Sequence, residues 1–158
     1  MLFELVRIDD RLIHGQVATT WLKDYDIEQV LIVDDEVANN ELKKNMALIA
    51  APTGIKIHIF GVNKFLEVMN KTNITRKTLL LLTNPFDLKK IIDSGIEIDT
   101  VYIGGMRASE ERTRISKAVH ISNLEKQAFI DLKNVNLIVQ TVPRDEKNDL
   151  ITLINNKE

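Results

Sequence analysis

Residues 78–95 read TLLLLTNPFDLKKIIDSG, and this stretch decides the fold class. Its four consecutive leucines are apolar on both faces, which is typical of a strand in a parallel sheet that helices cover on each side. Asn84 and Pro85 then place a capping residue and a proline at a helix start, and Gly95 closes the helix. The stretch therefore predicts a buried parallel strand followed directly by a helix.

The same alternation of apolar runs and helical patterns continues along the chain. Helical spacing is clear from Val62 to Met69, and Ser122 with Glu125 matches a capping box at another helix start. The strand candidates are Leu2–Ile8, Gln29–Val33, Lys56–Phe60, Thr78–Leu82, Thr100–Ile103, Ala118–Ile121 and Asn136–Gln140. This alternation predicts a single domain with an open, doubly wound, mostly parallel α/β sheet and helices on both faces.

Composition and charge exclude several classes of function. The 158 residues are 44% hydrophobic and 28% charged, and the net charge is −2, so the chain lacks the basic footprint of a nucleic-acid-binding protein. The absence of cysteine excludes disulfides, thiol catalysis and thiolate metal sites. No apolar stretch approaches the roughly 20 residues of a membrane span, and the N-terminus lacks the pattern of a signal peptide. We therefore expect a cytoplasmic protein that does not itself span a membrane.

The segment 7–17, RIDDRLIHGQV, is the most informative about function. It follows the first apolar strand and leads into a helical pattern from about Gln16, so His14 and Gly15 lie in the first strand-to-helix turn. Backbone N–H groups at a helix N-terminus favour a bound phosphate, and histidine can act as a nucleophile near neutral pH. The segment predicts that His14 accepts a phosphoryl group.

Neighbouring residues are candidates to hold the phosphoryl oxygens. Arg11 offers a planar guanidinium that matches them, and the turn around Gly15 and Gln16 offers backbone N–H groups. Arg7, on the strand, points either to the site or to a structural acid. We expect Arg11 to act in catalysis, and Arg7, Gly15 and Gln16 to bind phosphate or a partner.

Asp9 and Asp10 allow two interpretations. A carboxylate bonded to the imidazole would fix its tautomer and support the charge that develops on phosphorylation; we expect Asp10 to do this, with Asp9 as the open alternative. An acidic pair after the first strand also occurs in metal-binding aspartyl-phosphate receiver domains. Those domains need an acceptor Asp after the third strand and a Lys after the fifth, where this chain has Phe60-Gly61 and Gly104, so the receiver interpretation fails.

A stretch rich in glycine and arginine interrupts the alternation. Residues 104–114 begin with two glycines, contain three arginines and have no clean helical face, so we predict a long loop. Because it follows a strand, it leaves from the carboxyl edge of the sheet, where ligands bind in open α/β folds. We expect Gly105, Arg107 and Arg112 to contact phosphate or a partner; the alternative is an exposed basic loop. No G-x-G-x-x-G follows the first strand, so a dinucleotide site is not indicated.

The other two histidines lie in strand patterns. His58 and His120 have apolar neighbours and no flanking glycine or arginine, so we expect both to be structural. Three separated histidines give no metal-ligand spacing, and neither a metal nor another cofactor is expected. From the residues alone, a phosphocarrier competes with a non-catalytic module that holds a phosphometabolite through the same turn and arginines.

The run from Arg7 to Trp21 closely resembles the active-site signature of the IIB component of the mannose/fructose/sorbose-type sugar phosphotransferase system (PTS). Gly104-Gly105-Met106, Ile115–Val119 and Gln140–Pro143 resemble further segments of that family, and the resemblance extends over essentially all 158 residues. One departure lies at Glu111–Arg114, where relatives commonly have a glycine followed by a basic residue, threonine and glutamine.

The resemblance implies a doubly wound fold and an enzyme, a protein-phosphohistidine–sugar phosphotransferase. It implies that a histidine of a IIA protein or domain gives its phosphoryl group to His14, which binds it through the ring nitrogen Nδ1. The group then passes to a sugar during uptake through the IIC and IID membrane components. The chain would be one IIB domain over residues 1–158, cytoplasmic and peripherally associated with the permease, without a cofactor, a metal or nucleic acid.

Overall fold

A seven-stranded sheet organises residues 2–157, which are the residues that the computed structural model describes, apart from the side chains of residues 16–18. The strand order is β3-β2-β4-β1-β5-β8-β9. The strands are β1 (Leu5–Asp9), β2 (Gln29–Val33), β3 (Lys56–Phe60), β4 (Thr78–Leu82), β5 (Thr100–Gly105), β8 (Asn136–Val139) and β9 (Asn148–Asp149). Neighbouring strands are parallel, except that β9 runs antiparallel to β8.

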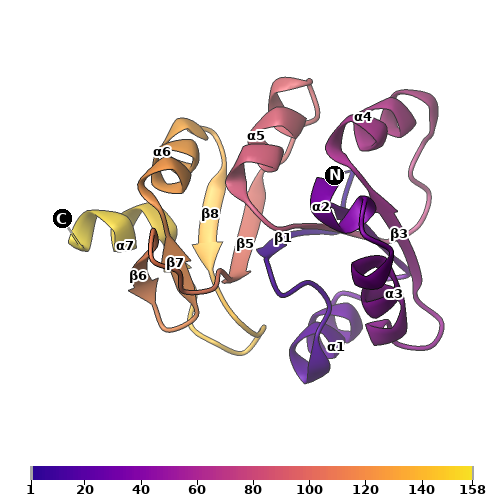
Figure 1. Ribbon diagram of the computed structural model, residues 1–158, viewed down its shortest axis with the longest axis horizontal. Coiled ribbons are helices and arrows are strands. Elements are labelled where there is room, and N and C mark those ends of the chain that lie inside the picture. The colour runs from indigo at the N-terminus through magenta and orange to yellow at the C-terminus, as the bar shows by residue number, and fades with distance from the viewer. Residues whose placement is uncertain (1, 158) are drawn as a thin grey trace.

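Helices cover both faces of this sheet (Figure 1). They are α1 (Gly15–Asp24), α2 (Asp35–Ala38), α3 (Glu41–Ala50), α4 (Val62–Lys71), α5 (Pro85–Asp93), α6 (Asn123–Asp131) and α7 (Leu150–Asn156). On one face, α1 and α3 bury Trp21 and Ala47. On the other, α4 to α7 bury side chains that include Phe65 and Phe129. Within the described residues, none of the helices is long and apolar enough to cross a membrane.

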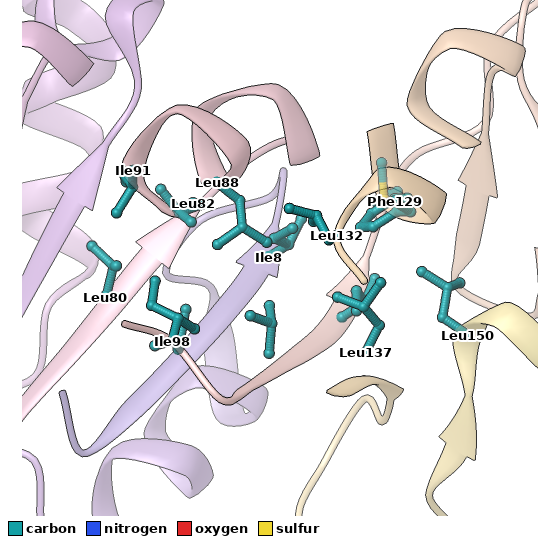
Figure 2. Close-up of a cluster of buried hydrophobic side chains, with 14 of the residues drawn as sticks. Ile8, Leu80, Leu82, Leu88, Ile91, Ile98, Phe129, Leu132, Leu137 and Leu150 are labelled. Carbon is teal, nitrogen blue, oxygen red and sulfur yellow. The ribbon is translucent and has the colours of Figure 1, made fainter. Parts of the chain in front are cut away.

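The four leucines of β4 divide between these two faces. Leu79 and Leu81 pack in the cluster beneath α1 and α3, whereas Leu80 and Leu82 pack in the cluster beneath α5. Figure 2 shows Leu82 beside Leu88 of α5 and Leu80 farther along the same strand. Both faces of β4 are therefore buried, which confirms the strand that the leucine run predicts.

The central strand β1 is the point at which the strand order reverses. After β1 the chain builds β2 and β3 on one side, returns to β4 between β2 and β1, and then crosses to β5 on the other side. In open α/β sheets such a reversal leaves a crevice at the carboxyl ends of the strands, where ligands bind. The turn from Asp10 to His14 lies at this crevice.

Local patterns predict most strands closely. Gln29–Val33, Lys56–Phe60 and Thr78–Leu82 have the predicted bounds. The first strand is Leu5–Asp9 rather than Leu2–Ile8, because parallel pairing with β4 begins at Leu5. The capping box of Ser122 and Glu125 is confirmed at the start of α6.

The prediction of one long loop over residues 104–114 is wrong at both ends. β5 continues through Gly105, and β6 (Thr113–Ser116) pairs antiparallel with β7 (Val119–Ile121) in a second, two-stranded sheet. Backbone hydrogen bonds explain the difference: Met106 N–H donates to the carbonyl of Ala118, and the carbonyl of Met106 accepts from His120 N–H, both at 2.9 Å. Only residues 107–112 form the irregular connection, called the arginine loop below.

The packing of the central core predicts how much stability is lost when a buried side chain is shortened. Leu80 is fully buried in β4, so Leu80→Ala removes packed methyl groups and should lower the free energy of unfolding by about 2–5 kcal/mol. The control is Ile49→Ala on α3, where the side chain is 83% exposed and the loss should stay within about 0.5 kcal/mol. Urea denaturation followed by circular dichroism measures both changes. Equal losses would contradict this placement of β4.

Candidate functional site

Two left-handed residues shape the turn between β1 and α1. Leu12 has a φ of 62° and Gly15 a φ of 48°. For leucine this conformation costs roughly 1–2 kcal/mol, and the N–H of Leu12 closes the turn by donating to the carbonyl of Asp9 at 3.0 Å. His14 is the N-cap of α1, and its side chain makes no capping hydrogen bond. The first turn of α1 therefore offers backbone N–H groups without a side-chain cap, a favourable place for an anion.

Asp9 holds Arg11 through both carboxylate oxygens. The backbone N–H and Nε of Arg11 donate to Oδ1 of Asp9, and Nη2 donates to Oδ2, each at 3.0 Å. Nη2 also donates to the carbonyl of Gly104 at 3.3 Å. The hydrogen bond to Asp9 is the main cause that raises the pKa of Arg11 above its usual value. Since Asp9 is buried and the Arg11 side chain is 29% exposed, Arg11 reaches the surface from an internal anchor.

Arg7 lies beneath the turn and is almost completely buried. Its Nη1 donates to the carbonyl of Gln140 at 3.3 Å, its Nη2 donates to the carbonyl of Thr141 at 3.4 Å, and its guanidinium lies 4.0 Å from the ring centre of Trp21. Burial lowers the pKa of Arg7 to about 10, against the opposing effect of the Asp9 charge. This arrangement does not fit the predicted contact with phosphate or a partner. It fits the structural alternative, in which Arg7 faces an acid.

Asp10 contacts the arginine loop instead of the imidazole. Its Oδ2 accepts from Nη1 of Arg112 at 2.8 Å and from the backbone N–H of Arg107 at 3.0 Å. Arg112 is also paired with Glu125, through Nε to Oε1 at 2.9 Å and Nη2 to Oε2 at 2.7 Å. The structure therefore does not place Asp10 where the predicted role in orienting His14 requires it. Asp10 ties the arginine loop to the first turn.

His14 is oriented by a backbone carbonyl. Its Nδ1 lies 3.1 Å from the carbonyl oxygen of Leu12. Because a carbonyl oxygen can only accept, Nδ1 carries a proton in this arrangement, which in the neutral ring leaves the lone pair on Nε2. Nε2 is buried without a hydrogen-bond partner in the described part of the chain. The resting ring thus does not present Nδ1, the nitrogen that the family resemblance implies is phosphorylated.

A cleft of about 790 Å³ joins these residues at the carboxyl ends of the strands. Arg11 and His14 line it from the first turn, and Arg107 and Arg112 line it from the arginine loop. The opposite wall comes from α2, α3 and the turn after β4, and it was not predicted; it includes Asp34, Glu36, Lys43, Met46, Thr83 and Asn84. The position of Asp34 and Thr83 directly after β2 and β4 is the signal that could have identified this wall.

The remaining candidates lie outside this cleft. Gly15 faces a different groove, along α1, and Gly105 is buried at the end of β5. The side chain of Gln16 lies outside the described residues. His58 is exposed on β3 and His120 lies on β7, with its Nδ1 3.2 Å from the carbonyl of Met106. Among the described residues, no group of His, Asp and Glu side chains is arranged to hold a metal ion.

The contact with Leu12 predicts the tautomer of His14 in the free protein. ¹⁵N NMR of the histidine rings should assign the Nδ1–H tautomer to His14 and also to His120, which faces a carbonyl in the same way. The signals are assigned by their loss in His14→Ala and His120→Ala. A predominant Nε2–H tautomer at His14 would contradict the described orientation of the ring.

Comparison with known proteins gives one consistent family. The model of the family described as "PTS system sorbose subfamily IIB component" matches residues 3–158. The chain is 36% identical to the sorbose-specific EIIB component of Lacticaseibacillus casei over 98% of this chain and 96% of that protein. It is 35% identical to the mannose-specific EIIAB component of Escherichia coli K12 over 98% of this chain, but it spans only about half (49%) of that longer relative.

The fold gives the same result. The crystal structure of the IIBSor domain of the Klebsiella pneumoniae sorbose permease superposes with a TM-score of 0.94 at 34% identity, covering 100% of this chain and 99% of that domain. This agreement also confirms the doubly wound, mostly parallel sheet that the sequence predicts. The chain belongs to the sorbose subfamily of PTS IIB components.

Proposed function

We propose that this chain is a phosphocarrier of a sugar PTS, in which His14 accepts a phosphoryl group from a histidine of a IIA protein or domain and passes it to a sugar. The observation that carries the proposal is the placement of His14 and Arg11 in one cleft, beside an uncapped helix N-terminus. A nucleophile, a guanidinium and backbone N–H groups are what a transferring phosphoryl group requires. Membership in the IIB family supports the same chemistry.

The transfer exchanges one nitrogen–phosphorus bond for another. A nitrogen of His14 forms a bond to phosphorus while the bond between phosphorus and the donor imidazole breaks, and the donor ring leaves with that electron pair. The ring of His14 keeps its proton on the nitrogen that did not attack. Because both nitrogens belong to imidazoles, the step is close to thermoneutral, which suits a relay. Its rate depends on in-line positioning and charge stabilisation.

We assign the attack to Nδ1, following the family resemblance. In the resting structure Nδ1 faces the carbonyl of Leu12 at 3.1 Å. The ring therefore has to turn away from Leu12, and its proton has to move from Nδ1 to Nε2, before the lone pair of Nδ1 can reach phosphorus. The Leu12 carbonyl holds the imidazole until that step.

Three arginines of the cleft, Arg11, Arg107 and Arg112, supply positive charge for the phosphoryl oxygens. In the described part of the chain, Nη1 of Arg11 has no hydrogen-bond partner, so it is available to a phosphoryl oxygen. Arg107 has a side chain that is 69% exposed at the rim, where it can meet an incoming partner. Arg112 is committed to Asp10 and Glu125, so it contributes charge and fixes the arginine loop.

The same proposal gives the partners and the location. The name of the E. coli relative, EIIAB, joins a B component to an A component, which supports a IIA protein or domain as the phosphoryl donor. The acceptor is a sugar that crosses the membrane through IIC and IID components. We treat residues 1–158 as one IIB domain that acts in the cytoplasm, peripherally associated with that permease.

Phosphoryl labelling tests the acceptor directly. Incubation with phosphoenolpyruvate and the upstream relay proteins should add one phosphoryl group that is stable to base and labile to acid, as expected for phosphohistidine. His14→Ala should abolish labelling, while His58→Ala and His120→Ala should keep it, because those two rings lie outside the cleft. Labelling that persists in His14→Ala would refute the assignment. If the wild-type protein bound phosphate without becoming labelled, the result would favour the non-catalytic phosphometabolite-binding module.

Replacing Arg11 tests the charge stabilisation. Arg11→Lys keeps the positive charge beside Asp9, so the variant should fold normally. It loses the planar fork that pairs with Asp9, so it should transfer the phosphoryl group slowly. Loss of one well-placed electrostatic donor typically reduces a rate about 10²–10³-fold. Rapid-quench measurement of phosphoryl transfer to His14 gives the rate. Wild-type kinetics in a folded Arg11→Ala variant would rule this role out.

A further inference from the structure

We infer that Asp9 is a positioning residue that aims the guanidinium of Arg11 at the phosphoryl group, and that Gly104 and Gly105 provide the space for this arrangement. The inference rests on the proposed function, because it concerns the phosphoryl group of that reaction. It gives Asp9 a task other than contact with the imidazole. Asp9 acts through Arg11 and touches no reacting atom.

The grip of Asp9 fixes the direction of Arg11. Three hydrogen bonds of 3.0 Å join the carboxylate to the backbone N–H, Nε and Nη2 of Arg11. The side edge of the guanidinium is thus fully used by Asp9, and Nη2 also reaches the carbonyl of Gly104. The nitrogen left over is Nη1. Because a guanidinium is planar and rigid, holding one edge sets the direction of the hydrogens on Nη1.

Arg7 holds the carboxylate from the other side. Asp9 and Arg7 are two positions apart on β1, so their side chains project from the same face of the sheet. Nη2 of Arg7 lies 3.9 Å from Oδ2 of Asp9, and Arg7 is itself fixed by backbone carbonyls and by Trp21. Asp9 therefore cannot move away from Arg11 without leaving the buried charge of Arg7 unpaired, which is costly.

The two glycines of β5 are what make room for both guanidinium groups. The register between β1 and β5 shifts after Ile8, so that Asp9 is opposite Gly105 and Gly104 is an extra residue. A Cβ at position 104 would lie 2.9 Å from Cζ of Arg7 and even closer to its Nη2. A Cβ at position 105 would lie 2.5 Å from Nε and 2.6 Å from Cζ of Arg11. Any side chain at these positions would displace an arginine.

Stability alone does not account for this cluster. A buried group of ions usually stabilises a fold no better than apolar residues of similar volume, because desolvation offsets the attraction. The cluster of Arg7, Asp9 and Arg11 has one positive charge more than it needs to neutralise the carboxylate. That excess charge is directed into the cleft through Arg11, where it is available to an incoming phosphoryl group.

Gly105→Ala tests the inference without changing any charge. The added methyl group forces the guanidinium of Arg11 off Asp9, so transfer to His14 at saturating phosphorylated IIA protein should slow about 10²-fold, with little change in KM. The matched control is Gly61→Ala at the end of β3, where the new Cβ lies 2.8 Å from Oδ1 of Asp35. This control should lower Tm through crowding and keep the wild-type transfer rate.

A double-mutant cycle separates positioning from general damage. Arg11→Gln removes the guanidinium, so adding Gly105→Ala to it should slow transfer no further if Gly105 acts only through Arg11. A structural effect would instead add to that of Arg11→Gln. Additive effects in the cycle, or a wild-type rate in Gly105→Ala alone, would overturn the inference.

An NMR signal gives a readout that needs no rate. In the wild-type protein the Nε–H of Arg11 should give a ¹H–¹⁵N signal protected from solvent exchange, unlike that of the exposed Arg107. Asp9→Asn and Gly105→Ala should both lose this protection. If Asp9→Asn does not fold, the wild-type spectrum and Gly105→Ala still decide, because equal exchange of Arg11 and Arg107 in the wild type refutes the grip.

Wild-type labelling distinguishes this inference from the proposed function. If the wild-type protein takes no phosphoryl group, the proposed function fails, and the inference that rests on it is overturned as well. If the wild type and Gly61→Ala are labelled at full rate and Gly105→Ala matches them, only the positioning role of Asp9 is refuted.

Discussion

The buried carboxylate of Asp9, enclosed by two guanidinium groups, is the interaction on which the rest of the site depends. It lies at the last residue of the central strand, so its counterions have to fit between β1 and β5. Space for them requires residues without side chains on β5 and a shift in strand register. The position of Arg11 and the course of β5 into the arginine loop both follow from that packing. One ionic cluster thus connects the centre of the sheet to the cleft.

Features set by neighbouring residues can be predicted from this sequence, whereas features set by distant residues cannot. The leucines of β4, the capping box of α6 and the position of His14 in the first turn are all encoded locally. In contrast, Asp10 meets Arg112 across 102 positions, and Arg7 meets the carbonyl of Gln140 across 133. No periodic pattern in the sequence encodes such contacts. The predicted contact between Asp10 and His14 therefore rests only on the charge of Asp10 and on its short distance from His14 along the chain. The strand candidate Ala118–Ile121 corresponds to β7, but β6 and its antiparallel pairing with β7 are not predicted, because a strand of four residues is too short to carry an alternating pattern.

The two walls of the cleft differ in how their charges are satisfied. On the wall of α2 and α3, Glu36 is paired with Lys43, while Asp34 caps α2 and also accepts from Thr83. These acids are therefore engaged within their own wall. The wall of the first turn and the arginine loop contributes Arg11, Arg107 and Arg112, of which Arg11 is paired with Asp9 and Arg112 with Asp10 and Glu125. Arg107, which is largely exposed and lies 3.9 Å from Asp10, is the least compensated of the three. An anion that enters the cleft is accordingly drawn toward the side on which His14 lies, because positive charge that no neighbouring carboxylate neutralises attracts an anion most strongly.

Glu125 has two separate duties, although it touches no reacting atom. Its Oε1 accepts from the backbone N–H of Ser122, which completes the cap of α6, and both of its oxygens accept from Arg112, which is in turn bonded to Asp10. The cap requires a side chain of this length, and the pair requires a negative charge. Glutamine would meet the first requirement, aspartate would meet the second, and only glutamate meets both. Substitutions at position 125 are therefore limited by two requirements at once, the cap at the start of α6 and the ion pair that holds the arginine loop beside the cleft.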